Sequence, residues 1–330
     1  DKLNAMNNLW RNFCVSDAFE PGSTAKPFTL ATGLETGTLT GQETYVCQGG
    51  TWKGDWYIQC HNTSGHGTEN VDQAIANSCN VALMAMADKI GVEDFIRYQH
   101  IFGFGEYTGI DLPGEASTEN LIFTAENMGE TDLATSSFGQ SFNVTMTQMV
   151  SAFSSLINGG YYYQPHVVKQ IQDENGNVIE TNDPTLLRKT VSKQTSDRVK
   201  EALRAVMTDG TGVPANVEGY DIGGKTGTAE KLPRGNGDYL LSFIGYAPQE
   251  NPEVVIYVVI DEPNVENQEL SSYVLELSQK IMAEAFPYLN ITRNGDALPE
   301  DSGVREDVQQ DFDENFEDTY SCLLYTSDAA

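Results

Sequence analysis

Positive charge is scarce in this chain. Its 330 residues include 48 acidic and only 19 basic residues, which gives a formal net charge of −29. Such a balance disfavours binding to polyanions, so we expect neither nucleic acid as a partner nor docking on anionic lipid headgroups. The chain also lacks any run of about 18 to 20 uninterrupted apolar residues, the length that a membrane-spanning helix requires.

Histidine and cysteine are also few, with four and five residues. No cluster of them has the spacing of a zinc motif, so we expect no metal and no cofactor, and we interpret His66 as a loop residue that makes hydrogen bonds. Cys47 and Cys60 would be direct cross-strand partners if Lys53-Gly54 formed a two-residue turn. A disulfide and two reduced thiols are equally open interpretations of that pair.

The composition is otherwise that of a packed domain, with 39% apolar and 10% aromatic residues. From about residue 290 onward the chain is acidic and aperiodic, which predicts disorder. Residues 322–330 resemble translated sequencing-adapter read-through and are excluded from fold reasoning. We therefore expect one folded domain over residues 1–289 and an acidic tail over 290–330.

Hydrophobic periodicity predicts a mixture of helices and strands. Apolar residues at helical spacing and turn residues at their ends predict helices over 70–101 with a break at 77–80, and over 144–157, 196–207 and 270–286. Alternating and β-branched runs predict a hairpin over 44–60 and strands over 161–171, 222–230, 239–247 and 254–260. The last three strands have short connections, which indicate an antiparallel meander.

Ser23 and Lys26 are three residues apart after a Pro-Gly turn, where a helix is predicted to begin. On a helix this spacing puts a hydroxyl and an amine on one face, as a nucleophile and its base require. The lysine could act as a base only if burial or a neighbouring cation lowered its pKa. The pattern alone is weak, because it occurs by chance about once in a chain of this length.

Lys225-Thr226-Gly227-Thr228 is a much stronger signal, since chance would produce it in only a few per thousand chains of this composition, a rough estimate. On an edge strand this segment offers a cation and two hydroxyls to a substrate carboxylate. Its glycine would let the substrate lie against the backbone. The alternative is an ordinary strand with solvated Lys and Thr.

A Ser-x-Asn triplet occurs twice, at Ser78-Cys79-Asn80 and at Ser141-Phe142-Asn143. Position favours the first, because Ser78 falls between two predicted helices, from where both polar side chains can project into a cleft. We interpret Cys79 as a small residue packed behind that cleft.

The order of these three motifs resembles that of the penicillin-recognising serine enzymes. The sequence around the motifs resembles that of a class B, monofunctional penicillin-binding protein of the division or spore-cortex type. The segments that carry this resemblance are Glu20-Pro21-Gly22-Ser23, Gly65-His66-Gly67, Asn77-Ser78-Cys79-Asn80, Gly139-Gln140, Gly223-Gly224-Lys225-Thr226-Gly227-Thr228-Ala229-Glu230 and Gly245-Tyr246-Ala247-Pro248.

The resemblance implies a role for each motif residue. Ser23 would attack the carbonyl between the two terminal D-alanines of a peptidoglycan stem peptide, and Lys26 would accept its proton. Ser78 would bridge Lys26 and Lys225 and pass the proton to the leaving amine. Asn80 would hold the amide of the acyl chain.

The remaining implied roles concern binding. Thr226 and Thr228 would bind the terminal carboxylate, and the N–H groups of Ser23 and Thr228 would form the oxyanion hole. An amine of a second stem peptide would then take the acyl group, while β-lactams would acylate the same serine.

The family's fold is a β-lactamase/transpeptidase-like α/β (α+β) domain, in which an antiparallel sheet flanked by helices lies beside an all-helical subdomain that carries Ser78. In that family about two strands precede the nucleophile helix, so we expect an N-terminally truncated chain without its membrane anchor. The implied location is the extracytoplasmic face of the bacterial membrane, with membrane proteins of wall synthesis as partners.

Two other functions use the same motifs. A β-lactamase or D,D-carboxypeptidase would pass the acyl group to water. A non-catalytic sensor or scaffold of the same fold is a third possibility, which the intact Ser23, Lys26 and Lys225 disfavour.

Overall fold

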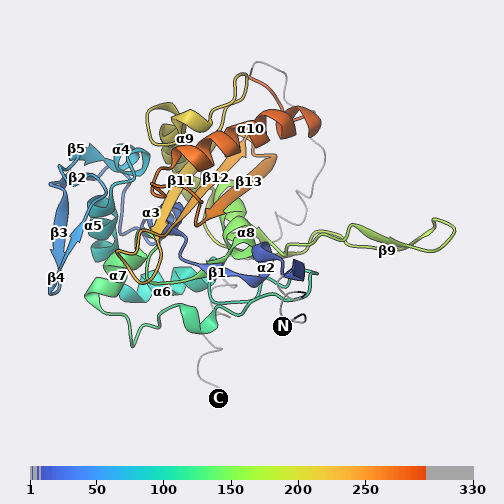
Figure 1. Cartoon of the computed structure of the whole chain (residues 1–330), viewed down its shortest axis with the longest axis horizontal. Helices are drawn as coiled ribbons and strands as arrows, with labels where there is room; N and C mark the ends of the chain where they lie inside the picture. The colour runs from blue at the N-terminus through green and yellow to red at the C-terminus, as the bar shows by residue number, and fades with distance from the viewer. Residues whose placement is uncertain (1, 3–5, 7–8, 295–330) are drawn as a thin grey trace.

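A three-stranded antiparallel sheet lies at the centre of the computed structural model, which describes residues 2, 6 and 9–294 (Figure 1). Its strands are, in order, β11 (Gly223–Glu230), β12 (Tyr239–Ala247) and β13 (Val254–Asp261). The predicted meander is confirmed. The predicted acidic tail falls outside the described residues except for 290–294.

Helices cover both faces of this sheet because the central strand is apolar on both sides. Leu241 and Phe243 of β12 pack with α10 (Ser272–Tyr288), whereas Ile244 and Tyr246 point to the opposite side. That side is covered by α8 (Met146–Ile157) and α9 (Lys193–Thr208). Alternation along one strand thus produces the expected antiparallel sheet flanked by helices.

The second region is mainly helical and lies beside the sheet. It contains the helices α3 (Lys26–Glu35), α4 (Val71–Ala76), α5 (Asn80–Ile90), α6 (Val92–Ile101) and α7 (Glu130–Ser136). The helical span predicted over 70–101 is confirmed, with its break at residues 77–79. α5 is buried on most sides, since Leu83, Met84 and Met86 have no exposed surface. Over residues 9–294, no helix has both the length and the apolar character needed to cross a bilayer.

The hairpin predicted over residues 44–60 is wrong in its register. Lys53 of β3 (Gly50–Lys53) pairs with Trp56 of β4 (Trp56–Gln59), so the turn is at Gly54-Asp55. Gly54 has φ +56°, a conformation that glycine adopts at the first turn position without cost. Cys47 therefore does not oppose Cys60.

Cys47 belongs to another pair of strands. It ends β2 (Thr44–Cys47), which pairs with β5 (Gly67–Asn70), and its partner residue is Gly67. Cys47 and Cys60 are free thiols in the structure, and both are buried.

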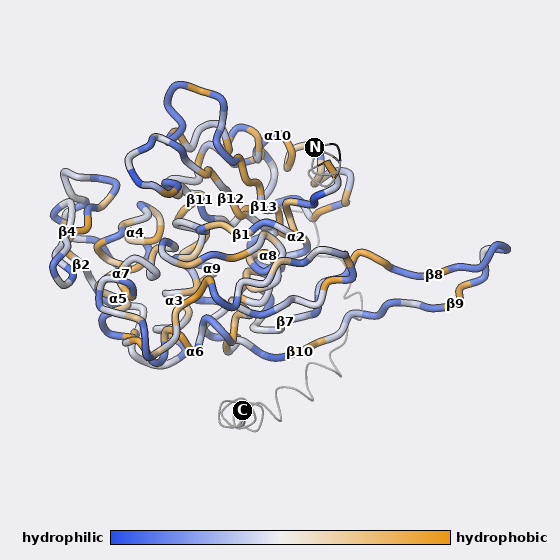
Figure 2. The backbone as a smooth tube through the Cα atoms, turned by 60° about the horizontal axis from the view of Figure 1, so that its bottom comes forward, coloured by the Kyte–Doolittle hydropathy of each residue, from blue (hydrophilic) through white to orange (hydrophobic). Residues whose placement is uncertain are grey.

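The strand predicted over 161–171 is divided in two. β7 (Tyr161–Tyr163) pairs with β10 (Leu186–Lys189), while β8 (Gln170–Gln172) and β9 (Val178–Thr181) form a separate hairpin. Pro165 lies between β7 and β8, where its missing N–H interrupts strand pairing. The β8–β9 hairpin projects away from the body of the molecule, and its far end is largely hydrophilic (Figures 1 and 2).

Candidate active site

Ser23 lies in a short 3₁₀ helix, η1 (Gly22–Ala25), that leads directly into α3. The entry into η1 is tightly packed. Gly22 has φ +57° and its N–H donates to the carbonyl of Gly139 at 2.9 Å. A Cβ on Gly139 would lie 1.8 Å from the Gly22 carbonyl oxygen, so both glycines are required for this approach. The Ser23 side chain, by contrast, is only half-buried.

Lys26 begins α3 and is fully buried. Its Nζ donates hydrogen bonds to the carbonyl of Ser78, to the Ser78 hydroxyl at 3.0 Å and to Asn80 Oδ1 at 2.8 Å. Burial lowers the pKa of Lys26 to about 8, against a smaller opposing effect of the nearby thiols and of Glu69. A lysine in this state loses its proton near neutral pH, as a general base must.

Ser78 lies in the turn between α4 and α5, in a left-handed conformation with φ 56°. This conformation is unusual for a residue other than glycine and is held by the surroundings. The N–H of Ser78 donates to the carbonyl of Ile75 at 3.1 Å. Asn80 Nδ2 donates to the carbonyl of Gln59 at 3.4 Å, which ties the turn to the end of β4.

Lys225 reaches the hydroxyl of Ser78 from the central sheet. It lies on β11, is fully buried, and its Nζ donates to the Ser78 hydroxyl at 3.0 Å. Burial, followed by the charge of Lys26, lowers the pKa of Lys225 well below its ordinary value. The first, second and third motifs thus meet at one hydroxyl group.

The threonines of the third motif lie at the same site. Thr226 Oγ1 lies 2.8 Å from Thr211 Oγ1 and 3.3 Å from the Lys225 ammonium. Thr228 lies opposite the nucleophile segment, since a Cβ on Gly22 would be 2.8 Å from the Thr228 carbonyl oxygen. Thr211 belongs to no sequence motif, and the turn after α9 brings it next to Thr226.

Packing in the structure gives Gly227 a reason to be small besides the predicted approach of the substrate. A Cβ at this position would lie 2.3 Å from Ser242 Oγ and 3.0 Å from Thr24 Cγ2. The absent side chain therefore lets η1 pack directly against β11. This contact brings Ser23 and the third motif together.

The second Ser-x-Asn triplet lies elsewhere in the hydrogen-bond network. Ser141 Oγ is 2.9 Å from Thr135 Oγ1, and the N–H of Ser141 donates to Glu20 Oε1 at 2.7 Å. Glu20 also accepts two hydrogen bonds from Arg234, at 2.9 and 2.7 Å. This triplet therefore braces the segment that precedes Ser23.

Cys79 packs inside the protein, as interpreted from the sequence, and has no exposed surface. Its Sγ accepts the N–H of Ala82 at 3.5 Å, so it caps the N-terminus of α5. A hydrogen bond from the Cys79 thiol lowers the pKa of Cys60. His66 lies in a loop, as interpreted from the sequence, and its Nδ1 lies 3.8 Å from Cys60 Sγ.

Comparison with known proteins identifies the family. A family profile described as "Penicillin binding protein transpeptidase domain" matches residues 1–285. The chain is 35% identical over 286 residues to stage V sporulation protein D of Bacillus subtilis, covering 85% of this chain and 44% of the relative. It is 30% identical to penicillin-binding protein PbpB of Mycobacterium tuberculosis, covering 76% of this chain and 38% of the relative. The chain thus spans less than half the length of these relatives.

Solved structures show the same fold. Penicillin-binding protein 3 of M. tuberculosis superposes with a TM-score of 0.77 at 27% identity, covering 86% of this chain and 66% of that chain. A peptidoglycan glycosyltransferase of Burkholderia ambifaria gives a TM-score of 0.72 at 26% identity, with 86% and 84% coverage. The structure of penicillin-binding protein 3 has also been solved in complex with aztreonam and with ampicillin.

Proposed function

Because the chain belongs to the penicillin-binding protein transpeptidase domain family, we propose that it is a peptidoglycan D,D-transpeptidase with Ser23 as its nucleophile. The observation that carries this proposal is the Ser78 hydroxyl, which lies 3.0 Å from the ammonium groups of both Lys26 and Lys225. A hydroxyl within hydrogen-bond distance of two buried amines is placed to relay a proton between them. Several relatives carry the name peptidoglycan D,D-transpeptidase.

The proposed reaction begins at Ser23. Neutral Lys26 accepts the hydroxyl proton while the serine oxygen attacks the carbonyl carbon of the D-Ala-D-Ala bond. The oxyanion lies between the N–H groups of Ser23 and Thr228, and such a donor is worth roughly 3 to 4 kcal/mol in other enzymes. This placement is supported by the close approach of η1 to β11.

The second half of the reaction returns the proton. Ser78 passes it to the nitrogen of the departing D-alanine, which leaves an acyl ester on Ser23. An amine of a second stem peptide then attacks this ester and gives a proton to Lys26. Lys26 passes this proton to the Ser23 oxygen as the ester bond breaks and the new peptide bond forms. Asn80 holds the acyl chain's amide and fixes Lys26 through its 2.8 Å hydrogen bond.

The third motif would bind the substrate's carboxylate. The hydroxyls of Thr226 and Thr228 would bind it, and Lys225 would supply the opposite charge. Such a carboxylate raises the pKa of Lys225 again, because an opposite charge favours the ammonium form. β-Lactams carry the same carboxylate, so they would acylate Ser23 in place of the substrate.

We place the enzyme in bacterial wall synthesis on the extracytoplasmic face of the membrane, where stem peptides are cross-linked. Similarity to a sporulation protein supports a role in the spore cortex over one in vegetative division. Membrane proteins of the same synthesis machinery would be its partners. The domain proposed for this activity extends over residues 1–289.

The experiment is acylation of the purified chain by a fluorescent penicillin, followed by peptide mapping. We expect one adduct on Ser23 and none in a Ser23→Ala variant. A persistent adduct together with transfer of a D-Ala-D-Ala donor to an added amine supports the transpeptidase. Rapid release of penicilloate would instead indicate a hydrolase, and no adduct with any β-lactam or thioester donor would indicate a scaffold.

A further inference from the structure

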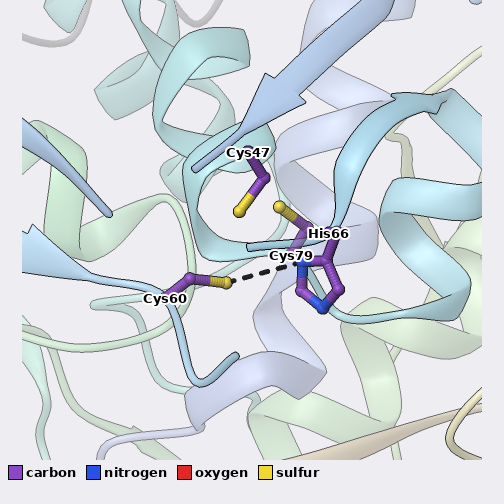
Figure 3. A group of neighbouring side chains, drawn as sticks. All are labelled: Cys47, Cys60, His66 and Cys79. Carbon is purple, nitrogen blue, oxygen red and sulfur yellow. Dashed lines mark hydrogen bonds between the residues drawn. The ribbon is translucent and has the colours of Figure 1, made fainter. Parts of the chain in front are cut away.

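Three cysteines and one histidine converge behind the catalytic Ser-Cys-Asn turn. They are Cys47 at the end of β2, Cys60 after β4, His66 before β5, and Cys79 in the turn itself. Their ligand atoms all lie within 4.8 Å of one another, and the side chains point toward a common centre (Figure 3). We call these four residues the thiol cluster.

The backbone around the thiol cluster is built to bring its members together. Gly65 has φ +85°, and a Cβ there would lie 2.5 Å from the carbonyl oxygen of Cys47, so the loop that carries His66 can approach β2 only with glycine at that position. The N–H of Cys60 donates a hydrogen bond to the carbonyl of Gly49 at 2.9 Å, which fixes the position of Cys60 at the end of β4. The cluster is therefore fixed by close backbone packing.

The three thiols are shielded from solvent, with exposed fractions of 2% for Cys47, 1% for Cys60 and 0% for Cys79. A disulfide would use only two of them and leave the third thiol and the imidazole. Three sulfurs and one imidazole nitrogen are instead the ligands of a closed tetrahedral zinc site. With Zn–S bonds of about 2.3 Å the sulfurs would lie about 3.8 Å apart, so shifts of about 1 Å suffice.

A buried carboxylate supplies an independent sign of a cation. Glu69 is 3% exposed, and its Oε1 accepts a hydrogen bond from Asn77 at 2.7 Å. Its Oε2 has no hydrogen-bond partner among the described residues and lies 3.7 Å from His66 Nδ1. A buried carboxylate with an unpaired oxygen is costly unless a positive charge is close. A metal ion held by the neighbouring His66 and the three thiols would supply such a charge.

We propose that the thiol cluster binds one Zn²⁺ ion, with Glu69 beside it, and that this ion holds the Ser-Cys-Asn turn in its catalytic geometry. The ligands are three thiolate sulfurs and a neutral imidazole nitrogen, so binding displaces the protons of any thiols that carry them. Soft thiolates favour Zn²⁺ over Mg²⁺ and Ca²⁺.

The position of Cys79 connects the metal to catalysis. Its neighbours are Ser78, held in the left-handed conformation, and Asn80, hydrogen-bonded to Lys26. Fixing the sulfur between them restrains both side chains. The metal site itself does not depend on the proposed transpeptidase activity; only its effect on acylation does.

The first test measures the metal directly. The full chain is purified under reducing conditions without chelator, and its zinc is quantified by elemental mass spectrometry. We expect about one zinc per chain, as for a single tetrahedral site. Cys47→Ser and His66→Ala should each lower this content, whereas Cys14→Ser, which alters an exposed cysteine outside the cluster, should keep it. Replacement by Co²⁺ should give the visible bands of tetrahedral thiolate coordination.

The second test uses the unaltered chain, so it does not depend on whether the variants fold. Zinc is removed with a chelator and restored, while the melting temperature and the rate of Ser23 acylation are followed. We expect a lower melting temperature and acylation slowed by roughly 10- to 100-fold, as small displacements in an active site produce, with both restored by Zn²⁺.

Two results would overturn the proposal. A reduced, folded chain that binds no Zn²⁺ at micromolar concentration would exclude the site. An equal rate of Ser23 acylation before and after removal of zinc would exclude the effect of the metal on catalysis. Because zinc is measured without substrate, a chain that holds zinc yet never acylates would overturn the proposed function and leave the site standing.

Discussion

The ammonium group of Lys225 lies 3.0 Å from the hydroxyl of Ser78, although 147 residues separate the two in the chain. The same hydroxyl accepts a hydrogen bond from Lys26, so it links helix α3 to strand β11. Removing it in Ser78→Ala leaves the two lysines without their bridge. We expect acylation of Ser23 by a fluorescent penicillin to slow by about 10²- to 10⁴-fold.

The matched control for this variant is Ser141→Ala, in the other Ser-x-Asn triplet. The Ser141 hydroxyl contacts only Thr135 among the hydrogen bonds of the described residues. Its loss should leave acylation within about twofold of the unaltered chain, as for an exposed hydroxyl outside the relay. Equal rates for the two alanine variants would contradict the relay.

Acylation should also depend on pH through Lys26. Burial lowers the pKa of Lys26 to about 8, and only the neutral amine can accept the serine proton. Below that pKa each unit of pH therefore lowers the neutral fraction, and with it the acylation rate, about tenfold, whereas above it the rate should level off. Stopped-flow acylation between about pH 6 and pH 9.5 would measure this. A profile flat across that range would show that Lys26 is not the base.

The sequence sufficed to predict the sheet and the three motifs because both depend on local patterns. The strands over 222–260 are short runs of strand-forming residues separated by turn residues, and the third motif is rare enough to stand out from composition. No local pattern shows that Lys26 and Lys225 share one hydroxyl: that expectation came from the family resemblance, and the two lysines meet only through tertiary packing. Gly227 illustrates the difference, because the motif can be seen in the sequence, whereas its packing against Thr24 and Ser242 can be seen only in the structure.

The thiol cluster shows where sequence reasoning failed. Zinc motifs are identified by short spacings between ligands, and residues 47, 60, 66 and 79 have none of these. Two separate strand pairs bring them together. β2 pairs with β5, which sets Cys47 opposite Gly67, the neighbour of His66, and Cys60 follows β4 of the other hairpin. Cys47 and Cys60 are thus close in space, as members of a cluster of four residues and not as a cross-strand pair.

The β8–β9 hairpin should be dispensable for acylation. All residues of both strands are exposed, and the hairpin projects from the body (Figure 1). The N–H of Asn182 donates to the carbonyl of Lys169 at 2.9 Å, so residues 170–181 can be replaced by an Asn-Gly turn without strain. We expect acylation within about twofold and little change in melting temperature, since few buried contacts are lost.

The segment just before β8, which contains Val167 and Val168, should be retained in that variant. The Asp111 carboxylate accepts hydrogen bonds from the N–H groups of Val167 at 2.7 Å and Val168 at 2.8 Å, which fix this segment to the body of the molecule. If acylation fell as far as in Ser78→Ala, the hairpin would have to contribute to the active site, contrary to its position.

Gly227→Ala tests whether packing of η1 against β11 positions the nucleophile. The new Cβ would lie 2.3 Å from Ser242 Oγ and 3.0 Å from Thr24 Cγ2, and overpacking of this kind costs about 1 to 3 kcal/mol. Thermal unfolding should show the loss of stability, and acylation should slow because Ser23 moves away from Thr228. The double variant Gly227→Ala/Ser242→Ala removes the closest of these contacts and should recover part of both losses, with Ser242→Ala alone as the control. If the double variant recovered stability but not acylation, Gly227 would be needed for the substrate to approach the backbone, as the motif first suggested, and packing would not be its main role.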